Sequence, residues 1–273
     1  MALLFAFAIE LLLPVSRGDP RPLAERFGDW TRSLLTPAVG GRIAAALPWT
    51  IVLVGTATLL AFVVGTLLGA WIGRPRTARR RTVSVALAII LLACVPAYLI
   101  GKVLVSLFTQ TLHWLPPALA YAPTQRWTDP VAVGLDLAGH AVLPMTAIAL
   151  AGIGAFALTM RAAVVSASSE DHIVFAESIG LPDRRLFRAH QLRPALPAQV
   201  TALAIALGVV VSGSLLVEAT FSYPGLGWLL NESIINADVP LMRGVVLVLI
   251  VGLALATTLL DLLLPAIDPR IRR

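Results

Sequence analysis

Two long apolar runs on either side of a polar segment constrain this chain more than any other feature. Residues 137–160 and 194–217 each hold 24 residues without Asp, Glu, Lys or Arg. A helix of about 20 apolar residues crosses the hydrocarbon core of a bilayer. Hydrophobic residues make up 58% of the chain and charged residues only 13%, whereas soluble domains carry roughly a quarter charged residues. The sequence therefore predicts an all-α integral membrane protein.

Six membrane spans are predicted from the apolar runs. Their ranges are 1–15, 48–72, 83–108, 140–160, 198–221 and 242–267. The first run is too short to cross and contains Glu10, and it lacks the basic start and the cleavage site of a signal peptide. We interpret it as the incomplete first helix of a longer chain. The sequence then divides into a first helix with its outer loop (1–47) and a domain of five helices (48–273).

Arginine is concentrated in three segments that share one side of the predicted membrane. Residues 73–82 and 161–197 hold five Arg each and the tail after residue 267 holds three, against six in the loops of the other side. Basic residues in short loops favour the cytoplasmic side. This imbalance predicts that both termini are cytoplasmic. It also accounts for the net charge of +6 without a nucleic-acid partner.

Motifs of catalysis and cofactor binding are missing from the sequence. No phosphate loop of the form G-x4-G-K-[S/T] occurs, and the only lysine, Lys102, lies within a predicted span. The four His have no metal-ligand spacing, and the single Cys94 excludes an intramolecular disulfide and a cysteine metal site. We predict that the chain is not an enzyme, holds no metal and binds no cofactor itself.

The polar segment 161–197 carries five Arg and four acidic residues. Its Ser-Ser-Glu-Asp run at 168–171 is typical of a helix start, because hydroxyls and acids favour a helix N-terminus. A short amphipathic helix is predicted over 171–179. Gly180 is predicted to end it, since glycine commonly terminates helices. A short helix thus connects two spans on the predicted cytoplasmic side.

A second, basic helix is predicted over 184–193. We expect Pro194 and Pro197 to break it, because proline interrupts helical hydrogen bonding. The pair of helices has two physical interpretations, and the residues alone favour neither. The short helix could insert into the cleft of a partner protein, or it could lie on the lipid surface as an interfacial helix.

This segment resembles the cytoplasmic loop of the membrane subunits of ABC importers, and more closely that of the dipeptide/oligopeptide/nickel permease family. The matching residues are Met160, Arg161, Asp171, Ala176, Gly180, Leu181, Arg184, Arg185, Leu192, Arg193, Ala195 and Leu196. His172 stands where Tyr is usual, Pro194 where Asn is usual, and Val174 where the general importer signature begins with Glu. In such families the short helix is the coupling helix that docks on an ATPase subunit.

Further matches lie outside this segment. They are residues 18–20 (Gly-Asp-Pro), residues 218–228 (EATFSYPGLGW), Asp261 and residues 267–272. Pro224-Gly225 is typical of a tight turn, and the run that follows is too short and too polar to cross the membrane. We expect residues 221–236 to fold back as a short helix at the outer surface. A plain connecting loop is the alternative.

Together the matches resemble the B-type permease subunit of this family. The resemblance implies a type I ABC importer permease fold, with six transmembrane helices and a coupling helix at about 169–181. It implies half of a translocation pathway for peptides in a bacterial plasma membrane. The implied partners are a C-type permease subunit, one or two ABC ATPase subunits that bind ATP and magnesium, a solute-binding protein or lipoprotein, and membrane lipid. Nickel complexes and glutathione are alternative substrates, and a stand-alone channel or secondary transporter is the alternative of another class.

The resemblance also suggests two groups of site residues. The ATPase-coupling group is Asp171, Phe175, Ala176, Glu177, Gly180, Leu181, Arg184 and Arg185. The outer-gate or binding-protein group is Glu218, Phe221, Tyr223, Pro224, Gly225 and Trp228. Ala176 and Gly180 are expected to pack in the ATPase groove. Lys102 matches no family position: it could face the pathway and meet a peptide carboxylate, pair with an acid of a neighbouring helix, or extend to the interface.

Overall fold

In the computed structural model, residues 36–74, 79–122 and 129–267 are described, together with residues 22, 25, 28 and 32. The predicted first span, the match at 18–20 and most of the match at 267–272 lie outside these residues. The helices of the described part, in chain order, are α3 (Pro37–Ile72), α4 (Arg79–Ala93), α5 (Ala97–Leu104), the π-helical segment η2 (Val105–Thr111), α6 (Pro130–Ser168), α7 (Asp171–Ser178), α8 (Asp183–Arg185), the π-helical segment η3 (Leu186–Leu192), α9 (Arg193–Thr220), α10 (Leu226–Ile235) and α11 (Val239–Ile267).

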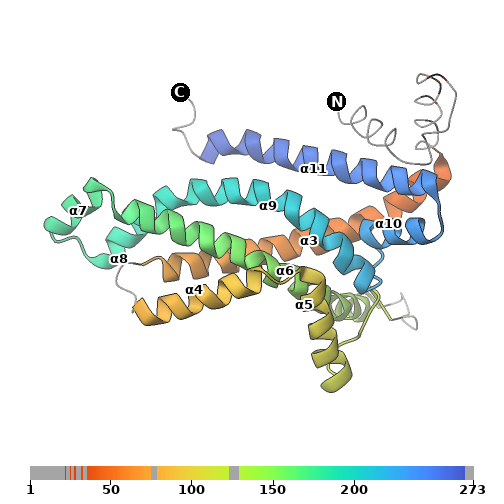
Figure 1. The fold of residues 1–273 in the computed structure, drawn as a ribbon, viewed down its shortest axis with the longest axis horizontal. Helices are drawn as coiled ribbons and strands as arrows, with labels where there is room; N and C mark the ends of the chain where they lie inside the picture. Colours follow the sequence, from red (N-terminus) through yellow and green to blue (C-terminus); the bar gives the residue numbers. More distant parts are fainter. Residues whose placement is uncertain are drawn as a thin grey trace.

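The long helices lie side by side in an elongated bundle (Figure 1). α3, α6 and the Val239–Leu259 part of α11 are each long and apolar enough to cross a membrane, with mean hydropathies of 2.4, 2.1 and 2.4. α4 and α5 qualify as a fourth span if the two are taken together. The predicted all-α membrane architecture is therefore confirmed in the described part of the chain.

Two spans begin earlier than the apolar runs suggest. α3 begins at Pro37 rather than at Pro48, and α6 begins at Pro130 rather than at His140. Proline is favoured at the first helical positions because its missing N–H would have no helical partner there. Asp129 adds an N-cap before α6 by accepting a backbone hydrogen bond at 3.0 Å. The last parts of both predicted outer loops are consequently helical.

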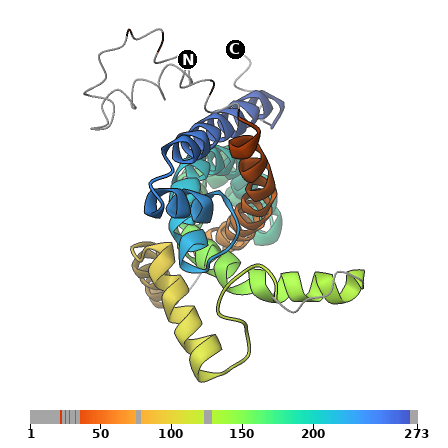
Figure 2. The same ribbon diagram turned by 90° about the vertical axis from the view of Figure 1, so that its right-hand side faces the viewer.

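The predicted third span is not one continuous helix but is bent in its middle. α4 and α5 meet at 98°. Pro96, which directly precedes α5, has no N–H to continue the hydrogen bonds of α4, and it disfavours helical geometry at Val95. Figure 2 shows that α5 and the N-terminal part of α6 project in different directions from the bundle.

α6 packs against both α3 and α9. Where α3 crosses α6, Gly65 and Gly69 let the two backbones approach: a Cβ atom on Gly65 would lie 2.6 Å from Phe156 Cβ. This G-x-x-x-G spacing is typical of close helix packing in membranes. Gln199 of α9 is fully buried and joins the three helices, since its Nε2 donates to Thr66 Oγ1 at 2.8 Å and to Phe156 O at 2.9 Å.

α8, η3 and α9 follow one another without a gap from Asp183 to Thr220, and we call them the α8–α9 rod. The predicted break at Pro194 and Pro197 is therefore wrong. The wider turns of η3 directly precede Pro194, where a regular α-helical turn would meet the missing N–H and the bulk of the ring. At 1.5 Å per residue the rod is about 55 Å long, and it reaches from the α7 end of the bundle toward α10 (Figure 1).

Candidate functional site

α7 stands at one end of the bundle, between α6 and the α8–α9 rod (Figure 1). As predicted, Gly180 ends this helix: its φ of +79° lies in the left-handed region that favours glycine. Gly180 N donates to Glu177 O at 3.0 Å, and Leu181 N donates to Ala176 O at 3.2 Å. This pair of bonds is the Schellman pattern, and it fixes the direction in which the chain leaves α7.

The start of α7 differs from the predicted capping. Ser168 Oγ donates to Val164 O at 2.7 Å and Ser169 Oγ donates to Ser166 O at 2.8 Å, so both hydroxyls bond back to the last turn of α6. No side chain caps the N-terminus of α7. Asp171 does lie in its first turn, as predicted, where a carboxylate interacts favourably with the helix dipole.

One face of α7 packs against the α8–α9 rod. Ile173 is 1% exposed and Ala176 is 6% exposed, and both form a cluster with Leu186, against which Leu181 also packs. The expectation that Ala176 packs against an ATPase does not fit this burial, because its side chain is covered by its own chain. α7 and the first turns of the rod thus share a small apolar core.

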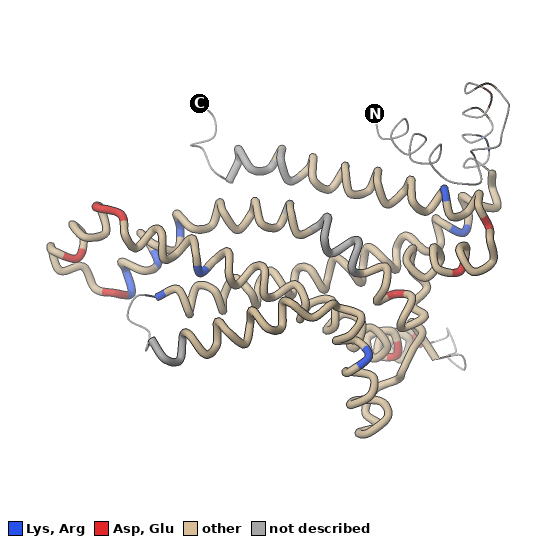
Figure 3. Tube along the Cα trace, in the orientation of Figure 1, with Lys and Arg blue, Asp and Glu red and all other residues tan. Residues whose placement is uncertain are grey.

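The opposite face of α7 is apolar and exposed. Val174, Phe175 and Ile179 are 61%, 65% and 61% exposed, and we call these three side chains the α7 tip. The exposed charged residues of the segment around it include Asp171, Glu177, Arg184 and Arg185 of the predicted coupling group. Figure 3 shows charges of both signs at this end of the bundle, separated from those at the other end by a mostly uncharged middle. An exposed apolar patch with a polar rim is typical of a protein interaction site.

At the other end of the bundle, Glu218 and Thr50 hold the start of α10. Glu218 is fully buried, and its Oε2 accepts hydrogen bonds from Gly227 N (2.6 Å) and Thr50 Oγ1 (3.2 Å). Thr50 Oγ1 accepts in turn from Leu226 N at 2.7 Å. Since the first N–H groups of a helix lack partners within it, α3 and α9 together cap α10. We call this arrangement the Glu218–Thr50 cap. It confirms the short helix expected within 221–236.

The Glu218–Thr50 cap leaves no room for a side chain at Gly225. A Cβ atom there would lie 2.5 Å from Thr50 Oγ1 and 2.6 Å from Glu218 Cδ. The predicted turn is present, with Gly225 N donating to Tyr223 O at 2.6 Å. Gly225 itself has φ −90°, and the left-handed residue of the turn is Ser222, at φ +49°. Glycine is therefore needed at 225 for close approach rather than for a positive φ.

The residues predicted at the outer gate differ in burial. Glu218, Phe221, Tyr223 and Gly225 are buried, and Pro224 and Trp228 are half-buried. The Tyr223 ring meets Trp49 edge-on, with ring centres 5.8 Å apart. Burial and, to a smaller extent, the Glu218 carboxylate raise the pKa of the Tyr223 phenol, which keeps it neutral. The buried members of this group therefore act through the helices that they contact: Glu218 through α10, and Phe221 and Tyr223 through their cluster with Leu53 of α3 and Ile100 of α5.

A second contact fixes the C-terminal half of α10. Arg42 of α3 forms an ion pair with Glu232 at 2.9 Å and with Asp238, just after α10, at 3.6 Å. Thr50 lies about two turns further along α3 and binds the start of α10. α10 is thus antiparallel to the first turns of α3 and is held at both of its ends.

Lys102 lies apart from both groups, on α5. Its side chain is exposed, and it forms no ion pair with any residue that the structure describes. The alternative in which Lys102 pairs with an acid of a neighbouring helix is therefore not observed among the described residues. Asp261 is the acidic residue of the predicted sixth span, and its side chain lies outside the described residues.

Comparison with known proteins identifies the class to which this bundle belongs. Residues 65–273 match the family described as "Binding-protein-dependent transport system inner membrane component". The chain belongs to this family.

Individual relatives agree with this assignment. The chain is 29% identical over 268 residues to a protein of Brucella abortus (strain 2308) that carries the name of a peptide transport system permease, with 94% of this chain and 83% of that protein covered. It is 28% identical over 242 residues to the glutathione transport system permease protein GsiC of Escherichia coli (strain K12), with 89% and 72% covered. Its fold is similar to that of a chain of the inward-facing MetNI methionine ABC transporter, with a TM-score of 0.65 and 16% identity over 86% of this chain and 100% of that one.

These findings confirm three of the sequence-based predictions: the family resemblance, the type I importer permease fold and the role of a permease subunit in an ABC importer. The chain is a multi-pass component of an inner membrane. The stand-alone channel and the secondary transporter are accordingly set aside.

Proposed function

We propose that this chain is the B-type permease subunit of a peptide importer and that ATPase subunits drive it by docking on the α7 tip. ATP and magnesium are bound by those subunits, and this chain performs no catalysis. A C-type permease subunit completes the pathway, and a solute-binding protein delivers the peptide. The relatives named as peptide and glutathione permeases support this substrate class, glutathione being itself a small peptide.

The observation that carries the proposal is the exposure of the α7 tip. Each of its three apolar side chains is more than half exposed, although burying such a side chain stabilises by about 1.5–3 kcal/mol. An interfacial helix on the lipid surface is the alternative. The position of α7 favours a protein partner, because Figure 1 shows it beyond the ends of α3 and α4, away from the apolar middle of the bundle.

The α8–α9 rod offers a mechanical route from the α7 tip to the outer end. α7 shares its inner core with Leu186, at the start of the rod, and Glu218 near the end of the rod caps α10. Closure of the ATPase subunits would displace α7 and, with it, the start of the rod. Since the rod has no break, the displacement would reach Glu218 and shift α10.

We further propose that the α7 end of the bundle is cytoplasmic. The C-terminal end of α3 and the N-terminal end of α4 lie at the same end of the bundle as α7 (Figure 1). This supports placing the arginines of 73–82 and of 161–197 on one side of the membrane. Both termini of the chain would then face the cytoplasm.

Paired substitutions on α7 test the docking role in the purified complex. Phe175→Ala removes a side chain of the α7 tip, and it is expected to weaken ATPase binding and peptide uptake about tenfold or more, since loss of a buried aromatic contact costs about 1.5–3 kcal/mol. His172→Ala is the matched control, because His172 is also exposed on α7 but contacts Glu170 (Nδ1 to Oε2, 3.1 Å). Wild-type ATPase binding after substitution of Val174, Phe175 and Ile179 together by Ser would refute the docking role.

A further inference from the structure

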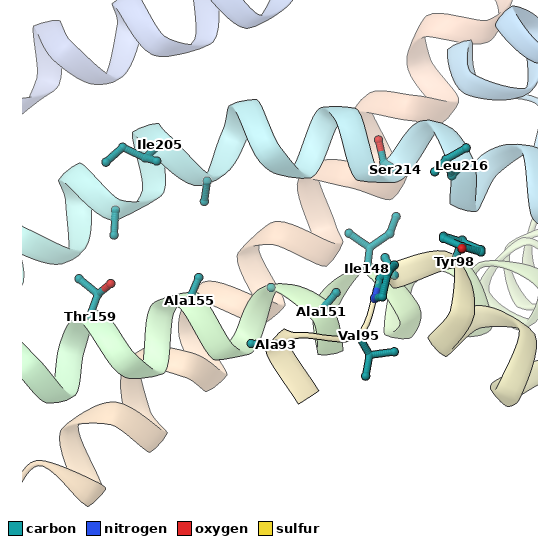
Figure 4. Close-up of a pocket in the computed structure, with 15 residues that line it drawn as sticks. Ala93, Val95, Tyr98, Ile148, Ala151, Ala155, Thr159, Ile205, Ser214 and Leu216 are labelled. Carbon is teal, nitrogen blue, oxygen red and sulfur yellow. The ribbon is translucent and has the colours of Figure 1, made fainter. Parts of the chain in front are cut away.

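The bend between α4 and α5 borders a cavity that the proposed coupling surface does not involve. The cavity has a volume of ≈ 430 Å³ and lies between the bend, α6 and α9 (Figure 4). Figure 4 shows Ala151 and Ala155 of α6 pointing across this space toward α9, with Tyr98 of the bend beside it. Small side chains account for much of the lining. The cavity is thus within the size range of small-molecule sites.

The lining of this cavity is almost wholly apolar. Its polar side chains are those of Tyr98, Thr159 and Ser214. Apolar groups of a ligand therefore fit the body of the cavity, whereas a charged group would have no partner there and would lose its hydration. A ligand that also carries charge must place that charge at the edge.

With Val83 placed at the membrane surface, as the predicted span has it, the bend lies within the membrane. From Val83, the first residue of the predicted span, the chain rises to Pro96 by about 20 Å at 1.5 Å per residue, whereas the hydrocarbon core is about 30 Å thick. Because α5 turns away at 98°, its residues stay near that depth. Irregular backbone within a bilayer occurs where it is buried in protein or lines a water-filled space.

Lys102 is a cation one helical turn beyond Tyr98, the residue of α5 that lines the cavity with its polar side chain. Tyr98 and Lys102 are four residues apart on α5, which places them on one face of the helix with Cβ atoms roughly 5–6 Å apart. The Lys102 side chain is exposed and forms no ion pair with the residues that the structure describes. A lysine at this depth is unfavourable unless it meets water or an anion.

We propose that this cavity is a substrate subsite, which takes the apolar side chain of a peptide's C-terminal residue while Lys102 pairs with the adjacent carboxylate. The inference rests on the proposed peptide import and refines its substrate class. An apolar side chain next to a carboxylate is the chemistry of a peptide that ends in Leu or Phe. The apolar lining favours the side chain of such a C-terminal residue, and the charge of Lys102 favours its carboxylate.

Uptake of defined peptides by the assembled transporter in vesicles tests the role of Lys102. One binding protein is used throughout, saturated with Ala-Ala-Phe or with its C-terminal amide. Lys102→Gln is expected to lower uptake of the free acid about tenfold, the effect of losing a hydrogen bond to a charged group, and to leave uptake of the amide unchanged. Lys102→Arg keeps the cation and should restore uptake of the acid.

Filling the cavity tests the side-chain part of the subsite. Ala155→Leu narrows the cavity and is expected to lower uptake of Ala-Ala-Phe about tenfold relative to Ala-Ala-Gly. Ala254→Leu is the matched control, because Ala254 is an exposed alanine of α11 that does not line the cavity. It should leave the ratio of the two peptides unchanged.

The outcomes separate this inference from the proposed function. If the wild-type transporter takes up no peptide, the proposed function fails. If peptides are taken up but Lys102→Gln and Ala155→Leu change neither ratio, the subsite alone is refuted. Lys102→Gln could instead lower uptake of the acid and of the amide equally, and reduce the amount of the second permease subunit that copurifies. That result would assign Lys102 to the contact between the two permease subunits and would also overturn the subsite.

Discussion

Replacement of Gly225 by alanine perturbs the Glu218–Thr50 cap directly. The added Cβ atom would lie 2.5 Å from Thr50 Oγ1 and 2.6 Å from Glu218 Cδ, so at least one capping group has to move. The hydrogen bonds affected are those from Leu226 N to Thr50 Oγ1 (2.7 Å) and from Gly227 N to Glu218 Oε2 (2.6 Å). All of these groups belong to buried residues. Water therefore cannot readily replace a lost partner.

The expected loss of stability follows from these two bonds. A buried donor or acceptor left without a partner costs about 1–3 kcal/mol. Loss of both bonds would sum to about 2–6 kcal/mol. A shift of α10 relieves part of the clash, so we expect the free energy of unfolding to fall by about 2–4 kcal/mol. Gly55→Ala is the matched control: Gly55 is exposed within α3, and nothing lies within 4 Å of an added Cβ atom. Alanine there should stabilise the helix by about 0.5–1 kcal/mol.

Thermal unfolding of the purified complex measures the effect. A loss of about 2 kcal/mol lowers the midpoint by roughly 4–8 °C for a chain of this size. Gly225→Ala should also reduce the stimulation of ATPase activity by the binding protein, because α10 is no longer held at its start. Binding of the ATPase subunits should stay at the wild-type level, since the α7 tip lies at the other end of the bundle. A midpoint within one degree of wild type, with normal stimulation, would show that the Glu218–Thr50 cap does not hold α10 in place.

Three further predictions concern the two ends of the bundle. Gly180→Ala places a side chain at φ +79° and should weaken ATPase binding by about 1–2 kcal/mol, measured by titration; an unchanged affinity would show that the Schellman turn does not aim the α7 tip. Arg42→Glu should lower the unfolding midpoint and Arg42→Glu with Glu232→Arg should restore it, with an effect of about 1 kcal/mol at most because the pair is partly exposed; equal midpoints for the single and double variants would contradict this. Cysteine labels at Arg188 and Asn231, both exposed, should react from the cytoplasm and from outside respectively, and labelling of both from one side would overturn the proposed topology.

Local signals predicted some elements well and others poorly. Gly180 marks the end of α7 because the left-handed conformation that follows the helix is a property of that single residue. Proline is less informative. Pro96 accompanies the bend between α4 and α5, whereas Pro48 and Pro144 lie inside α3 and α6 without ending them. What differs is the packing of the surrounding helices, which a local pattern does not contain.

The candidate site shows the same limit. The short helix at 171–179 is apparent from the sequence, but its two faces are not: Ala176 turns inward because Leu186 of the rod covers it, and Val174 and Ile179, absent from the predicted site, are exposed instead. Glu218 is recognisable from its motif. Its partner Thr50 lies 168 residues away in the chain, and no pattern in either segment connects them.

The two segments that carry the strongest family resemblance lie at the two ends of one helical rod. The first of these segments, 161–197, includes Leu186, which packs against α7, and the second, 218–228, begins with Glu218, which caps α10. A break at Pro194 would let the part of the rod before Pro194 move while the part after it stayed in place. The π-helical turns of η3 avoid this by accommodating the proline within a continuous helix. In the proposed mechanism, transmission of a displacement from α7 to α10 therefore depends on local backbone geometry at a point that touches neither site.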